Sequence, residues 1–150
     1  MHMNPCRDHR KDVLRMKEWT GGAVLSNLPS VTSTLDGWLE EISCPMKAQM
    51  QLDVAVDELF SNISSYAYSP GQGNATIRMN FNEADRMISV TFTDQGIPFN
   101  PLEKKDPDTT LSAAEREVGG LGIFLVKKTM DGMEYKREGN TNIVTIHKKI

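Results

Sequence analysis

The fold of this chain is decided by residues 47–68, KAQMQLDVAVDELFSNISSYAY. Apolar side chains recur there every three or four positions, which predicts a helix with one broad buried face. They are Leu52, Ala55, Val56, Leu59, Phe60, Ile63 and Ala67. The same spacing places Glu58 and Asn62 on one side of the helix, at the border of the apolar face. The Ser-Pro-Gly sequence at residues 69–71 predicts the helix end.

Downstream of this helix, the apolar residues recur with a period of two. Two such runs predict an antiparallel pair of half-buried strands, joined through residues 82–86. The apolar sets are Ala75, Ile77, Met79 and Phe81 in the first run, and Ile88, Val90 and Phe92 in the second. Residues 133–137 and 142–148 predict a final hairpin around a Gly-Asn turn.

The remaining segments predict a two-layer domain. Residues 29–43 predict a helix with Pro29 in its first turn, and residues 121–130 predict a shorter helix. Residues 16–28 predict an edge strand or a hairpin. Helices on one face of a mostly antiparallel sheet make an α+β fold, a two-layer sandwich, over residues 16–150.

Length and composition limit the class of protein. The chain has 150 residues, which fits one domain. Its net charge of -3 gives no bulk attraction to nucleic acid or to an anionic membrane. No apolar run approaches the roughly 18 residues of a membrane helix, so we expect a cytoplasmic protein. Residues 1–15 are polar and aperiodic, and we expect a flexible tail or extension there.

Asp94 is the first candidate for a functional residue. The period of two places it on the same face as Val90 and Phe92, which should be buried. A buried aspartate is costly unless it is paired, so it either caps the next turn or accepts a hydrogen bond from a ligand. The context DQGIPF favours an acceptor for an exocyclic amine such as that of adenine. Gly96 would allow the backbone to approach a flat ring closely.

Glu58 and Asn62 form the second candidate. An asparagine oxygen is a suitable ligand for Mg²⁺, and a glutamate one turn away could accept a proton from an attacking hydroxyl. By itself the pair is weak support, because a Glu and an Asn four residues apart more often lie on a solvated surface.

The third candidate is the run VGGLGIFLV at residues 118–126. Glycines at a junction between a loop and a helix expose backbone N–H groups and a positive helix end to an anion. The alternative is a flexible hinge before a buried helix. No Gly-Lys-Ser/Thr follows, so this is not a P-loop. Residues 95–118, which precede it, form a long polar connection of a length that is often functional.

The order of these three elements resembles the N, G1 and G2 boxes of the Bergerat (GHKL) ATP-binding fold, which histidine kinases and type II topoisomerases share. Within that fold, DELFSNISSYAY and DQGIPFNP look most like the anti-sigma-factor serine kinases of bacteria. The resemblance covers roughly residues 16–148. It departs at Tyr66, where the family often carries a histidine four residues after the metal-binding asparagine.

The resemblance implies a role for each element. Asn62 would hold the Mg²⁺ that bridges the phosphates of ATP or ADP, and Glu58 would be the general base for a serine hydroxyl on a partner protein. Asp94 would accept the adenine amine, with Gly96 beneath the ring. Residues 101–118 would form the ATP lid. The side chains and backbone groups expected at the phosphates are those of Arg116, Gly119, Gly120 and Gly122.

The resemblance implies a serine kinase that acts as an anti-sigma factor in a partner switch. It would bind a sigma factor, phosphorylate a STAS-type anti-anti-sigma protein and form a homodimer. The alternative is a non-catalytic module whose affinity for its partner depends on the bound nucleotide. The detached catalytic domain of a histidine kinase ranks last, because no long dimerisation helix with a phospho-accepting histidine precedes the domain.

Overall fold

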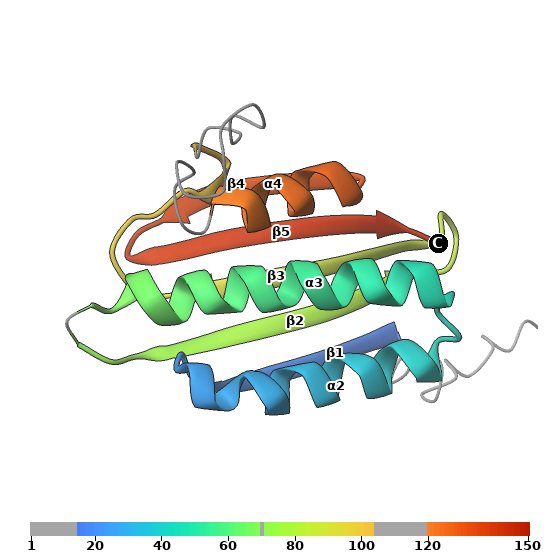
Figure 1. Cartoon of the computed structure of the whole chain (residues 1–150), viewed down its shortest axis with the longest axis horizontal. Helices are drawn as coiled ribbons and strands as arrows, with labels where there is room; N and C mark the ends of the chain where they lie inside the picture. The colour runs from blue at the N-terminus through green and yellow to red at the C-terminus, as the bar shows by residue number, and fades with distance from the viewer. Residues whose placement is uncertain (1–14, 70, 104–119) are drawn as a thin grey trace, which may run out of the picture.

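The computed structural model of the chain describes residues 15–69, 71–103 and 120–150. Within these residues, five strands form one sheet of antiparallel neighbours in the order β1-β2-β3-β5-β4 (Figure 1). Their bounds are β1 Met16–Gly22, β2 Asn74–Asn82, β3 Met87–Asp94, β4 Gly132–Glu138 and β5 Thr141–Lys149. The predicted antiparallel pair and the final hairpin are confirmed.

The α-helices of the described residues lie on one face of the sheet, and α3 lies over its middle strands (Figure 1). Their bounds are α2 Leu28–Glu41, α3 Met46–Asn62 and α4 Gly120–Thr129. Pro29 lies in the first turn of α2, as predicted. Two short 3-10 turns, η1 Leu25–Asn27 and η3 Pro101–Glu103, lie between the main elements. The predicted α+β sandwich is confirmed.

The hydrophobic core fills the space between the helices and the sheet. Its largest side chains, all less than 2% exposed, include Leu35, Trp38, Leu52, Phe60, Ile77, Met79, Ile88, Phe92, Ile123 and Ile146. The ring of Phe60 in α3 also packs edge-on against Trp19 of β1, with centroids 5.5 Å apart. The core therefore joins all three helices to strands β1, β2, β3 and β5.

Two polar residues share the inward side of the sheet with the core. In β3 every second side chain faces the helices, so Asp94 is buried on the same face as Phe92 and is 6% exposed. In β5 the same alternation buries Asn142 on the face that carries Val144, and Asn142 is 2% exposed. Because β3 and β5 are neighbours, Asp94 and Asn142 lie directly opposite each other in the register.

The helix predicted over residues 47–68 is α-helical only as far as Asn62. Ile63–Ala67 continue as a π-helical turn, η2. The carbonyl of Ala67 accepts a hydrogen bond from the N–H of Ile97 at 2.8 Å, which ties this turn to the loop after β3. Apolar spacing could not predict the π turn, because Ile63 and Ala67 lie on one buried side in either geometry. Such turns often occur at functional sites.

The N-terminal segment differs from the prediction in length. The strand predicted within residues 16–28 ends at Gly22, and η1 together with the start of α2 takes up the remainder. Residues 1–14 of the predicted tail lie outside the described residues. Of the helices that the structure describes, none combines the length and the apolar character needed to cross a membrane.

Two aspartates meet where α2 packs against α3. The pKa of Asp53 is raised from 3.8 to about 7, first by burial and then by the hydrogen bond and the charge of Asp36. Gln49 donates a hydrogen bond from Nε2 to Asp36 Oδ1 at 3.3 Å. Because the folded state raises this pKa, folding favours protonated Asp53. The stability that it contributes is present at pH values below the unfolded pKa and is lost as the pH rises toward about 7.

We therefore expect Asp53→Asn to stabilise the fold at about pH 8 and to have little effect at about pH 4. Asparagine has nearly the shape of the protonated carboxyl group, but it cannot ionise. Denaturant unfolding at the two pH values measures the difference in the free energy of unfolding. The matched control is Asp57→Asn, an exposed aspartate on the same helix. An equal gain at both pH values would contradict the assignment.

Candidate functional site

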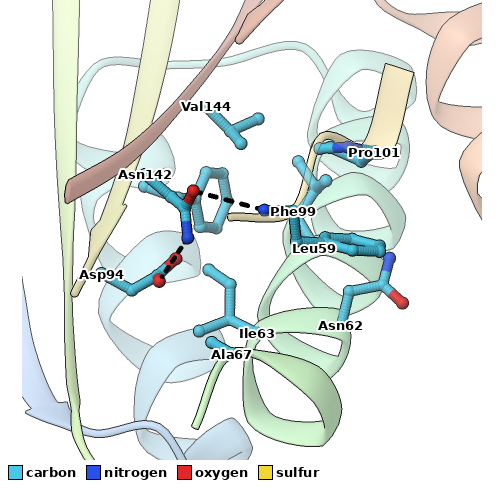
Figure 2. Close-up of a pocket in the computed structure, with 10 residues that line it drawn as sticks. Leu59, Asn62, Ile63, Ala67, Asp94, Phe99, Pro101, Asn142 and Val144 are labelled. Carbon is cyan, nitrogen blue, oxygen red and sulfur yellow. Dashed lines mark hydrogen bonds between the residues drawn. The ribbon is translucent and has the colours of Figure 1, made fainter. Parts of the chain in front are cut away.

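A pocket lies between α3, the ends of β3 and β5, and the loop that follows β3 (Figure 2). Its volume is about 360 Å³, including its open mouth. The lining residues are Leu59, Asn62, Ile63, Ala67, Phe92, Asp94, Phe99, Pro101, Asn142 and Val144. Only three of them are polar. An apolar wall with a few well-placed polar groups is typical of sites that bind and orient a small organic ligand.

Asp94 lies at the end of β3, where its buried carboxylate is held on one side. Its Oδ1 accepts hydrogen bonds from the N–H of Gly96 and from Nδ2 of Asn142, both at 2.9 Å. The carboxylate therefore caps the turn after β3, which was one of the two roles predicted for it. Among the described residues, both of its hydrogen bonds go to Oδ1. The second oxygen, Oδ2, is thus available to a donor on a ligand.

Asn142 connects Asp94 to the loop after β3. Its Nδ2 donates to Asp94 Oδ1 at 2.9 Å and to the carbonyl of Ile97 at 2.7 Å. Its Oδ1 accepts from the hydroxyl of Tyr135 at 2.7 Å and, at 3.4 Å, from the N–H of Phe99. Figure 2 shows the contacts of this amide with Asp94 and Phe99. A side chain of β5 thus orients both the carboxylate and the loop.

Asn62 lies on the side of the pocket opposite Asp94 and Asn142 (Figure 2). It is 8% exposed, yet its Nδ2 has no hydrogen-bond partner among the described residues. Leaving a buried polar group unpaired costs about 1–3 kcal/mol, so such groups are rare in native proteins. This end of the pocket is therefore suited to a ligand that carries polar groups.

Glu58 and Gly122 bring two of the predicted motifs together. Glu58 lies one turn before Asn62 on α3, and its carboxylate lies against Gly122 of α4. A Cβ atom at position 122 would overlap that carboxylate, so only glycine allows this approach. Gly120 is the first residue of α4. The helix that carries Glu58 and Asn62 thus lies beside the glycine-rich helix start, where backbone N–H groups favour an anion.

Gly96 packs against the π turn. A Cβ atom at position 96 would overlap the backbone carbonyl of Ala67, the group that also accepts the hydrogen bond of Ile97. Glycine is therefore required there by the close approach of two backbone segments. Its position beneath an adenine ring stays a prediction.

Two aromatic side chains stand at the edge of the site. The ring of Tyr66 stacks on that of Phe99, with centroids 5.7 Å apart and planes inclined by 28°. Phe99 lines the pocket, whereas Tyr66 is 45% exposed. The position at which the sequence departs from the resemblance thus contacts the loop that follows Asp94.

Part of the predicted site lies outside the described residues. Arg116 and Gly119 belong to that part, as does the predicted lid beyond Glu103. The beginning of the predicted lid, Pro101–Glu103, forms η3, and Pro101 lines the pocket. The roles of Arg116 and Gly119 stay predictions.

Comparison with known families identifies the domain. Residues 23–148 match the family model of the histidine kinase-like ATPase domain. The chain belongs to this family. The matched segment contains Glu58, Asn62, Asp94 and Gly122, and the family is the one predicted from the order of the three motifs.

Several members with named functions are similar to this histidine kinase-like ATPase domain. Serine/threonine-protein kinase BtrW of Bordetella bronchiseptica is 27% identical over 113 residues, which cover 73% of this chain and 79% of BtrW. The anti-sigma F factor of Clostridium perfringens is 26% identical over 140 residues, 93% of this chain and 94% of that protein. Serine-protein kinase RsbW of Halalkalibacterium halodurans is 30% identical over 91 residues, 58% of this chain and 54% of RsbW.

Solved structures show the same fold. The RsbU and RsbW domains of Rv1364c from Mycobacterium tuberculosis match with a TM-score of 0.63 at 14% identity, over 89% of this chain and 32% of that chain. The SiaB–SiaC complex from Pseudomonas aeruginosa contains a chain that matches with a TM-score of 0.59 at 16% identity, over 99% of this chain and all of the other.

Two residues that shape the site have no predicted role in it. The sequence pattern predicts Asn142 and Tyr135 only as members of the final hairpin. One feature of the sequence points to Asn142. It is a polar residue two positions before Val144, so the alternation of the strand places it on the same inward face. The same signal identified Asp94 in β3. Nothing in the local sequence connects Tyr135 to the pocket.

The two close glycine contacts predict effects of different size for the same substitution. Gly96→Ala should lower the free energy of unfolding by about 1–3 kcal/mol, because the new methyl group meets backbone that cannot move away. Gly122→Ala should cost less than about 1 kcal/mol, because it meets the end of the Glu58 side chain, which can rotate.

Denaturant unfolding of both variants measures these energies. Gly37→Ala, at an exposed position in α2 where a Cβ atom has no neighbour within 4 Å, is the control. Equal destabilisation by Gly96→Ala and Gly122→Ala would contradict the packing described above.

Proposed function

We propose that this chain is an ATP-dependent protein serine kinase that acts as an anti-sigma factor and phosphorylates a STAS-type anti-anti-sigma protein. The observation that carries the proposal is the arrangement of one pocket. A buried acceptor, Asp94, lies on one side of it (Figure 2). On the other side, one turn after Glu58, lies Asn62, whose Nδ2 has no hydrogen-bond partner among the described residues. The names of the relatives BtrW, RsbW and anti-sigma F factor support the kinase and anti-sigma assignments.

ATP fits the chemistry of this pocket. The apolar walls suit a purine base, and Oδ2 of Asp94 suits its exocyclic amine, which is a donor. At the opposite side, the Asn62 amide, whose Nδ2 has no partner in the described part of the chain, suits the phosphate end. It can donate to a phosphate oxygen or, after a half-turn about its terminal bond, present its oxygen to Mg²⁺. When bound, Mg²⁺ would neutralise charge on the phosphates.

Glu58 would act as the general base for the serine hydroxyl of the partner. Its carboxylate lies against Gly122, at the helix start where the phosphates of ATP or ADP would bind. Gly119 and Gly120 would contribute backbone N–H groups at the same place. We assign Arg116, on the predicted lid, to charge stabilisation of the phosphates. Phosphoryl transfer depends mainly on such positioning and charge stabilisation.

The partners follow from the same proposal. The chain would bind a sigma factor in one state of the switch and a STAS-type anti-anti-sigma protein in the other, as a homodimer in the cytoplasm. The similarity of nearly the whole chain to the anti-sigma F factor of Clostridium perfringens supports these partners.

A second candidate is a non-catalytic regulator that uses the same pocket to sense ATP or ADP. One observation favours it. Phe99 and Pro101 line the pocket, and Pro101 is the first residue of the predicted lid, so an occupied pocket would influence the lid whether or not phosphate is transferred. Partner capture that depends on nucleotide, without a phosphoprotein product, would distinguish this candidate from the kinase.

Asp94→Asn should weaken ATP binding by about 10- to 100-fold, because a hydrogen bond to a charged group is worth about 1.5–3 kcal/mol. Isothermal titration calorimetry with Mg²⁺-ATP measures the affinity. Asp57→Asn, which changes an exposed aspartate outside the pocket, should bind normally. Unchanged affinity in folded Asp94→Asn would place the nucleotide elsewhere.

Glu58→Gln should keep its affinity for ATP and lower phosphate transfer by about 100-fold or more, because the amide cannot accept the serine proton. The partner is first captured from native cytosol with Mg²⁺-ATP or Mg²⁺-ADP and is identified by mass spectrometry. Transfer to the purified STAS protein is then followed as new phosphoserine. Glu41→Gln, an exposed glutamate at the end of α2, is the control. Wild-type transfer by Glu58→Gln would remove Glu58 from the mechanism.

A further inference from the structure

We propose that Asn142 and Tyr135 are positioning residues that make the pocket select a purine with an amino group at position 6, adenine rather than guanine. The inference rests on the proposed nucleotide binding and goes beyond it, because it assigns base selectivity to two residues of the final hairpin. It starts from the hydrogen bonds of the Asn142 side chain, which is 2% exposed.

The orientation of the Asn142 amide is determined by its four contacts. The Asp94 carboxylate and the Ile97 carbonyl can only accept, so they must face Nδ2. The N–H of Phe99 can only donate, so it must face Oδ1. The hydroxyl of Tyr135 donates to Oδ1 in the same orientation, at 2.7 Å. A flipped amide would place its oxygen against two acceptors and its N–H group against a donor.

This fixed amide determines which oxygen of Asp94 meets the ligand. With the N–H of Gly96, Nδ2 of Asn142 occupies both lone pairs of Oδ1. Rotation of the carboxylate would break both hydrogen bonds within a buried site, so Oδ2 stays available to the pocket. An ionised carboxylate can only accept. It would attract the 6-amino group of adenine and repel the 6-oxo group of guanine.

Tyr135 acts on the Asp94 carboxylate indirectly, through Asn142. It is half-buried on β4, packs against the core and lies opposite Val144 in the register. Its hydroxyl reaches Oδ1 of Asn142 and does not contact Asp94 in the described residues. Removal of the hydroxyl would leave the ring and the core packing in place. It would relax only the amide that orients Asp94.

The test uses two variants of the full chain. Tyr135→Phe removes one hydroxyl, and Asn142→Leu replaces the amide with an apolar side chain of similar size. Thr145→Val is the control, because Thr145 lies on β5 but forms its hydroxyl contact with Thr91, at 3.2 Å. Calorimetry measures the affinities for ATP, for purine riboside triphosphate, which has hydrogen in place of the 6-amino group, and for GTP, all with Mg²⁺.

The wild-type protein should prefer ATP over purine riboside triphosphate by about 10- to 100-fold. Tyr135→Phe should reduce this preference by about 2- to 10-fold, since a neutral hydrogen bond is worth less than one to a charged group. Asn142→Leu should reduce it further and should also reduce the discrimination against GTP. Purine riboside triphosphate should bind all the variants with nearly the same affinity. Thr145→Val should keep the wild-type preference.

Three results would overturn the inference. One is an unchanged preference in a folded Tyr135→Phe protein, which is informative even if Asn142→Leu does not fold. The second is an equal loss of affinity for ATP and for purine riboside triphosphate, which would indicate a general structural role. The third is a wild-type protein that binds both equally, which would leave ATP binding intact. A wild-type protein that binds no nucleotide would instead overturn the proposed function as well.

Discussion

The structure of the site depends on the burial of one carboxylate. Asp94 ends a strand whose inward row is otherwise apolar, so its charge has to be compensated within the protein. The compensation comes from the backbone of Gly96 and the amide of Asn142, both on the same oxygen. This arrangement joins β3, β5 and the loop after β3 at one point. It also gives the pocket a directional acceptor at its buried end.

A second constraint is the close approach of backbone segments on either side of the pocket. The π turn at the end of α3 directs the carbonyl of Ala67 to the N–H of Ile97, and Gly96 lets the two segments touch. On the other side, Gly122 lets α4 reach the carboxylate of Glu58. The first contact is made by η2, which continues α3, and the second by α3 itself, so this continuous segment connects the predicted base end of the pocket to the predicted phosphate end. The geometry suits phosphoryl transfer because that chemistry depends on positioning.

The open edge of the pocket differs from its buried end. Phe99 and Tyr66 stack on each other there, and Pro101 begins the predicted lid. Several hydrogen bonds join the groups at the buried end, whereas a ring stack is the contact at the edge. A change in the occupant of the pocket would therefore affect the edge more easily than the Asp94 site. This asymmetry suits a protein in which the nucleotide state controls partner binding.

The sequence by itself determined most helices and strands and which side of each is buried. The spacing of apolar residues around Leu59 predicted α3. The alternation of side chains along β3 predicted that Asp94 faces inward like Phe92. The order of the three motifs predicted the family. These features are local, so periods of 3.6 and 2 reveal them. Only the tertiary structure decided that Asn142, 48 residues from Asp94, completes its hydrogen bonds, and that Gly122 meets Glu58. Those contacts depend on β5 lying beside β3 and on α4 packing against α3. Strand order and helix packing result from the burial of the whole core, which no short stretch of sequence specifies.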